Sequence, residues 1–221
     1  DLDTIFLESM GYMGFAHGYH HEFFGVELNQ CAQSLLSICF CNECSKRASA
    51  MGIDVDFVKQ ICRDYVDSVI NGNVKEEDID QLVEKYPELA AFINMRCGVV
   101  SSLVKEAKSI ATRRNVNIDY FGPVFEPSCK RAFIEGIDLG EITSSVDHYI
   151  IPVGSPDIAK INGEIEYAKT FTSPEKIALS LSLGPGGTPD QDNLHKKIDL
   201  IKLHNLDGCN LYNYSTIPFS K

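Results

Sequence analysis

The chain has 221 residues, of which 44% are hydrophobic and 23% charged, a composition typical of a folded globular protein rather than a disordered one. Its formal net charge of −11 argues against a surface for nucleic acid or anionic membrane, because both need basic patches. No apolar stretch approaches the roughly 20 residues of a membrane span, and the first residues do not resemble a secretion signal. We therefore expect a cytoplasmic protein that binds neither nucleic acid nor membrane.

Short apolar runs alternate along the chain with patterns typical of helices. This alternation predicts βα units and a parallel sheet. The last four runs are separated by stretches long enough for a helical crossover. The five predicted strands are Ile5–Leu7, Asn117–Phe121, Val146–Pro152, Ile177–Leu183 and Gly208–Tyr212.

Local signals place the helices. Asp54 is expected to cap a helix whose apolar positions, from Val58 to Val69, recur with a period near 3.6. Ser155-Pro156 and Thr188-Pro189 each put a capping hydroxyl before a proline, and Thr188 also fits a capping box with Gln191. A long, mostly helical insertion is predicted between the first two strands, at about residues 28–114.

Five βα units in series fit the later part of an eight-stranded (β/α)8 barrel (TIM barrel), roughly strands four to eight. The rival is a five-stranded doubly wound sheet. The strands end in polar or acidic residues followed by loops of functional character, which favours the barrel. A half barrel leaves open sheet edges, so this C-terminal portion needs an N-terminal half, either as a separate chain or as a segment absent from this sequence. The oligomeric state is left open.

Polar and aromatic side chains crowd the segment after the first strand. Glu8 follows the strand directly, where a barrel places its active site; the alternative is a surface glutamate at a loop start. The loop beyond it has imidazoles and a carboxylate that can hydrogen-bond the hydroxyls of a polar substrate. Metal ligation by the histidines is the alternative, although their spacing is not that of an H-E-x-x-H helix. The expected substrate-binding residues of this loop are His17, Tyr19, His20, His21 and Glu22.

Three of the eight cysteines form a C-x-C-x-x-C triplet at Cys39, Cys41 and Cys44. This spacing suits thiolate ligation better than a disulfide framework. A structural zinc ion needs four ligands, so the fourth would be Cys31 or a residue of the missing half. The alternative is three buried free thiols. No organic cofactor is expected.

These motifs resemble those of uncharacterised glycoside-hydrolase-like (β/α)8 barrel proteins. The resemblance rests on Glu8, on the histidine loop, and on the stretch from Leu35 through Cys44 to Gly52-Ile53-Asp54. The C-x-C-x-x-C run is also similar to the structural zinc loop of the family 42 β-galactosidases. The resemblance covers about the first 55 residues and implies a carbohydrate-active barrel rather than a particular substrate.

The sequence departs from the catalytic pattern of the β-galactosidases. No Asn precedes Glu8, and the run Ile177–Leu183 ends in Gly-Pro-Gly-Gly with no carboxylate. Glycosidases need two carboxyl groups, so Glu126, in the loop after the second strand, is the expected partner of Glu8. Tyr212 and Asn213, at the end of the last strand, are expected to contact the sugar.

The predicted function is hydrolysis of a glycosidic bond in a carbohydrate substrate. Two alternatives remain open. One is a metal-dependent barrel isomerase or amidohydrolase that uses the histidines, and the other is a non-catalytic carbohydrate-binding barrel.

Overall fold

The structure, a computed structural model, describes residues 2–15, 27–73, 78–124 and 129–212. The chain divides into two compact units. The sheet unit comprises residues 1–10, 101–132 and 139–221, and the helical unit comprises residues 11–100 and 133–138. Among the described helices, none has both the length and the apolar character that a membrane crossing requires.

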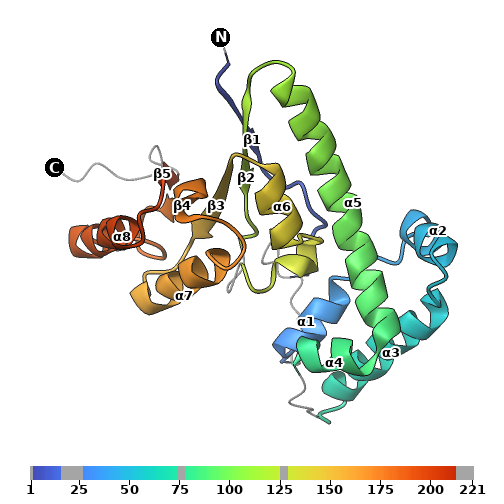
Figure 1. Ribbon diagram of the computed structural model, residues 1–221. Helices are drawn as coiled ribbons and strands as arrows, with labels where there is room; N and C mark the ends of the chain where they lie inside the picture. The colour runs from blue at the N-terminus through green and yellow to red at the C-terminus, as the bar shows by residue number, and fades with distance from the viewer. Residues whose placement is uncertain (1, 16–26, 74–77, 125–128, 213–221) are drawn as a thin grey trace. The chain divides into compact units, whose positions relative to one another are not determined.

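The sheet unit is built on parallel strands whose order across the sheet is their order along the chain (Figure 1). Each strand coincides with a predicted apolar run to within two residues at either end, which confirms the α/β prediction. The strands are β1 (Thr4–Leu7), β2 (Asn117–Phe121), β3 (His148–Val153), β4 (Ile177–Ser182) and β5 (Gly208–Tyr212).

The sequential strand order decides between the two predicted architectures. A doubly wound sheet reverses its strand order at a switch point. The described sheet runs β1-β2-β3-β4-β5 without a reversal, so every crossover moves the chain to the next strand in the same direction. If these crossovers have the right-handed sense that is usual for parallel strands, their linking helices lie on one face of the sheet. The arrangement argues against the doubly wound rival and agrees with part of a (β/α) barrel; the assignment to strands four to eight stays a prediction.

The helices of the sheet unit begin at different caps from those predicted. The helix α6 (Leu139–Ser145) precedes β3, α7 (Ile158–Ala168) precedes β4, and α8 (Gln191–His204) precedes β5. Asp157 caps α7 and Asp190 caps α8, so the predicted caps Ser155 and Thr188 are wrong. In each case a carboxylate two residues further along accepts the first free backbone N–H groups of the helix.

The two faces of the sheet differ in chemistry, because successive side chains of a strand point to opposite sides. The apolar face carries Tyr120, Tyr149 and the side chains aligned with them on the other strands. The two tyrosine rings are stacked, with 6.2 Å between their centres. Its central residues are all 4% exposed or less: Ile118, Tyr120, Tyr149, Ile151, Val153, Ile177, Leu179 and Leu181. The opposite face, called here the mixed face, carries Asp119, His148, Ser180, Ser182, Asn210 and Tyr212 among apolar neighbours.

Gly122, directly after β2, lies against the buried Tyr149 ring. A Cβ at this position would lie 2.5 Å from Tyr149 Oη and 3.0 Å from Cζ. Tyr149 is fully buried, so moving its ring aside would disturb the packing of the core around it. We expect Gly122→Ala to lower the free energy of unfolding by about 1–3 kcal/mol, as overpacked cores do.

The control is Gly163→Ala in α7, where an added Cβ meets nothing within 4 Å. Alanine in an open helical position should stabilise the protein by about 0.5–1 kcal/mol. Urea unfolding followed by circular dichroism measures both changes. Equal effects of the two substitutions would contradict the packing described around Tyr149.

The helical unit contains α1 to α4 and the first part of α5, which runs on into the sheet unit. Asp54 accepts a hydrogen bond from Phe57 N and caps α3, whose predicted apolar positions are all buried. Both predictions are confirmed. Helices α1, α3 and α4 lie together around a single apolar core (Figure 1). The helix bounds are α1 (Gln30–Leu36), α2 (Asn42–Ala50), α3 (Val55–Ile70), α4 (Ile79–Lys85) and α5 (Pro87–Thr112).

Candidate functional site

Glu8 stands where the parallel strands of the sheet unit end. It follows β1 directly and is exposed. Because side chains alternate along a strand, that of Glu8 is expected to point to the same side of the sheet as Phe6, the mixed face. The next residue, Ser9, has φ +57°, a left-handed conformation that costs a non-glycine residue about 1 kcal/mol. The chain therefore turns sharply just after Glu8, at the carboxyl end of the sheet.

Other polar side chains of the mixed face lie near the same end, on the far strands. Ser180 and Ser182 come from β4, and Asn210 and Tyr212 come from β5 in register with them. Ser180 is 3% exposed, whereas Tyr212 is 47% exposed. The structure thus places Tyr212 at the carboxyl end of the sheet, with its ring accessible.

Several predicted site residues lie outside the described part of the chain. They are the catalytic candidate Glu126, the loop residues His17, Tyr19, His20, His21 and Glu22, and Asn213 at the chain end. Their predicted roles therefore stay predictions.

A contact between His148 and Asp119 on the mixed face was not predicted. His148 Nδ1 lies 2.8 Å from Asp119 Oδ1, and His148 Nε2 lies 4.0 Å from Asp207 Oδ2. His148 is the first residue of β3, at the opposite end of the parallel strands from Glu8. We interpret this pair as a link between neighbouring strands. The sequence signal is a polar residue, Asp119 or His148, within each of two neighbouring apolar runs.

The cysteine triplet of the helical unit forms a compact ligand cluster. The sulfur atoms of Cys39, Cys41 and Cys44 all lie within 4.8 Å of one another. Tetrahedral zinc with bonds of about 2.3 Å needs sulfur atoms about 3.8 Å apart, so small side-chain movements suffice. The three residues therefore fit a thiolate-bound metal ion. Cys31 is not in the cluster but lies near Cys62 in the helical core, so the expectation that it supplies the fourth ligand is not supported.

The three thiols differ in environment. Cys41 is exposed just before α2. The pKa of the Cys41 thiol is lowered to about 7, mainly because the backbone N–H of Cys44 donates a hydrogen bond to it. Cys44 is buried, and desolvation raises its pKa to about 11. A thiolate is the form that binds metal. An incoming ion therefore meets an accessible thiolate first and then has to displace a proton from the buried sulfur.

Tyr12 contacts the cluster through Cys44, and Arg96 contacts Tyr12, all within the helical unit. The Cys44 thiol donates to Tyr12 Oη at 3.9 Å, and the Arg96 guanidinium stacks 4.4 Å from the centre of the Tyr12 ring. Burial, followed by the nearby Cys44, raises the pKa of Tyr12 to about 12. Burial also lowers the pKa of Arg96, whereas Tyr12, Cys97, Cys39 and Cys44 act in the opposite direction. The contacts of Tyr12 and Arg96 beside the cysteine cluster were not predicted from the sequence.

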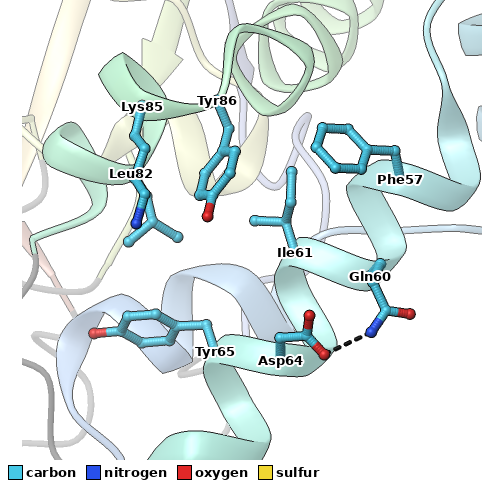
Figure 2. A pocket seen from close by; sticks show the side chains of 8 residues that line it. All are labelled: Phe57, Gln60, Ile61, Asp64, Tyr65, Leu82, Lys85 and Tyr86. Atoms are coloured by element: carbon cyan, nitrogen blue, oxygen red, sulfur yellow. Dashed lines mark hydrogen bonds between the residues drawn. The ribbon is translucent and has the colours of Figure 1, made fainter.

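The helical unit also contains a pocket of about 150 Å³ between α3 and α4. Figure 2 shows the Tyr86 hydroxyl directed into it, with Asp64 accepting a hydrogen bond from Gln60 at its edge. Small-molecule sites usually measure about 300–1,000 Å³. The pocket is small by this standard, and none of the predicted site residues lines it.

No protein-family model and no curated protein matches the chain. Two solved structures are similar in part. The spore cortex-lytic enzyme SleL of Bacillus megaterium QM B1551 has a TM-score of 0.40 and 10% identity, with 63% of this chain and 54% of SleL covered. A chitinase from Chromobacterium violaceum ATCC 12472 has a TM-score of 0.37 and 12% identity, with 58% and 57% covered. The chain thus spans just over half the length of each.

Likenesses this weak assign neither a fold nor an activity. No comparison supports the family 42 resemblance of the cysteine loop.

Proposed function

We propose that this chain is part of a (β/α)-barrel enzyme that hydrolyses a glycosidic bond, with Glu8 as one of its two carboxylates. The position of Glu8 carries the proposal. It is an accessible carboxylate at the carboxyl end of a parallel strand, in the direction of the mixed face. Barrel enzymes draw their catalytic residues from these strand ends.

The chemistry requires a second carboxyl group. One group acts as nucleophile or base, and the other protonates the leaving oxygen. Glu126 is the proposed partner, because β2 lies beside β1 in the sheet and Glu126 follows β2 by five residues. A separation of about 5 Å between the two carboxyl groups would give retention of configuration, and a wider one would give inversion.

We propose substrate contacts beyond the carboxyl ends of the two outer strands, β1 and β5. Tyr212, with an accessible ring at the end of β5, is proposed to pack against a sugar face, with Asn213 beside it in sequence. The loop from His17 to Glu22 is proposed to hydrogen-bond the hydroxyls.

The test is an assay of the full protein on a broad panel of aryl glycosides and oligosaccharides. Release of sugar by the wild type, lost when Glu8 is replaced, supports a glycosidase. Sugar binding without turnover on any substrate would instead identify a carbohydrate-binding barrel. Turnover lost on replacement of the loop histidines but retained without Glu8 would favour the metal-dependent enzyme.

We also propose that Cys39, Cys41 and Cys44 hold a structural zinc ion. The proposal rests on the mutual distances of their sulfur atoms. Protein purified without chelator is expected to contain about one equivalent of zinc by elemental analysis, and Cys44→Ser to contain less than a tenth of that. The control is Cys209→Ser, which changes an exposed cysteine in β5 of the other unit. Equal zinc content in the Cys44 variant and the wild type would contradict the assignment.

A further inference from the structure

We propose that Tyr12 and Arg96 form the outer shell of this metal centre. Tyr12 would donate a hydrogen bond to the Cys44 thiolate, and Arg96 would balance the negative charge of the metal–thiolate group. The inference rests on the proposed metal site and says nothing about the glycosidase activity. Its premise is that three thiolates on a divalent ion leave a net negative charge.

The first observation is the burial of the Arg96 charge. Arg96 is 1% exposed, and its Nη2 donates to the carbonyl oxygens of Ser37 and Ile134, both at 3.0 Å. Its Nε has no hydrogen-bond partner, and no carboxylate of the described residues forms an ion pair with the guanidinium. A buried cation with only neutral partners is costly, so an anion is expected close by.

The second observation is what the guanidinium faces. Arg96 stacks on the Tyr12 ring, and the Tyr12 hydroxyl meets the Cys44 sulfur at 3.9 Å. Contacts therefore lead from the buried cation to the cysteine cluster without a break. In metalloproteins, a residue outside the ligand set commonly orients a metal ligand through a hydrogen bond of this kind.

The charges balance when metal binds. Three thiolates and a divalent cation form a group of net charge −1, and each thiol that is still protonated releases its proton to solvent. The Cys44 thiolate can then only accept a hydrogen bond, so the Tyr12 hydroxyl becomes the donor. The positive charge of Arg96 compensates the group. Without metal, the cluster thiols that stay protonated leave this cation uncompensated.

Close backbone approaches hold Tyr12 in this place. Tyr12 N donates to Glu135 O at 2.8 Å. Gly136 has φ +73°, and a Cβ there would lie 2.7 Å from Cδ2 of the Tyr12 ring. A Cβ on Gly11 would lie 2.4 Å from Glu135 O. Glycine at position 136 thus leaves room for the Tyr12 ring, and glycine at position 11 lets the backbone beside Tyr12 approach Glu135 closely.

Competition titration with a chromophoric chelator gives the zinc affinity of each variant in the full chain. We expect Tyr12→Phe to weaken zinc binding about 10- to 100-fold, the usual effect of losing an outer-shell partner. The control, Tyr86→Phe, alters a tyrosine of the same unit that lines the pocket instead and should leave the affinity unchanged. The cobalt-substituted protein should keep its thiolate charge-transfer absorption in Tyr12→Phe, because all three sulfur ligands remain.

Arg96 is tested by a pair of variants, because a buried position tolerates few residues. Arg96→Lys keeps the charge and should retain more zinc affinity than Arg96→Gln, although both lose the paired carbonyl contacts. Unchanged affinity in Tyr12→Phe, or equal affinity in the two Arg96 variants, overturns the proposal while leaving the metal site in place. A changed cobalt absorption in Tyr12→Phe would make Tyr12 a ligand and also overturn it. Absence of zinc binding by the wild type refutes the metal site itself.

Discussion

The Glu8→Gln variant is expected to lose about 10³-fold in turnover of the full protein, because a carboxylate that acts as acid, base or nucleophile typically contributes 10²- to 10⁴-fold. The amide has the size of the carboxyl group but neither accepts a proton nor attacks a sugar carbon. Glu8 is exposed, so the exchange leaves no cavity and no buried charge behind. The loss should therefore appear in turnover and not in stability.

The control for this prediction is Glu106→Gln, at an exposed position of α5 in the same unit. It changes the net charge by the same amount and should leave turnover unaltered. Steady-state rates on the best substrate of the glycoside panel measure both variants, with circular dichroism to compare their folding. A Glu8→Gln enzyme with wild-type turnover removes Glu8 from the mechanism.

The strands could be predicted because their signal is local. Each is a short apolar run bounded by polar or turn residues, and the intervals between the last four admit a helix. The order of the strands stayed open between the barrel and the doubly wound sheet, because right-handed crossovers occur in both. The caps of α7 and α8 were predicted wrongly for an equally local reason. Ser155 and Thr188 precede a proline in the expected way, but Asp157 and Asp190 accept the helix N–H groups instead.

The cysteine cluster was predicted for the same reason as the strands. A C-x-C-x-x-C run brings its three sulfur atoms together with little help from the rest of the fold. Its surroundings could not be predicted, because they come from distant segments. Arg96 lies in α5 in a stretch that shows no sign of a buried charge, and only the folded chain brings it to the Tyr12 ring.

Glu135 is another buried charged residue that the sequence does not reveal. It follows the apolar residues Ala132–Ile134, where a glutamate is usually exposed, yet it is 7% exposed in the structure. Desolvation raises the pKa of its carboxyl group from 4.5 to about 7. The folded protein therefore binds this proton more tightly than the unfolded chain does. By linkage, protonation of Glu135 stabilises the fold.

The direction of the pH dependence follows from this raised pKa. The stabilising contribution is complete below pH 4.5, falls as the pH rises, and is lost above about pH 7. One pKa unit corresponds to 1.36 kcal/mol, so ionised Glu135 costs the fold about 3 kcal/mol at pH 8 relative to its protonated form. Glutamine is neutral at every pH and has nearly the same shape. We expect Glu135→Gln to raise the free energy of unfolding by about 3 kcal/mol at pH 8 and to change it little near pH 4.

Urea unfolding of both proteins at pH 4, 6 and 8 measures this difference, with Glu84→Gln at an exposed position of α4 as the matched control. The substitution leaves the backbone carbonyl of Glu135, and hence its bond to Tyr12 N, in place. Stabilisation that grows with pH in the Glu135 variant and is absent from the control is the expected result. A Glu135→Gln protein that is less stable than the wild type at pH 8 would mean that the ionised carboxylate is compensated within the fold. Desolvation would then not govern this group.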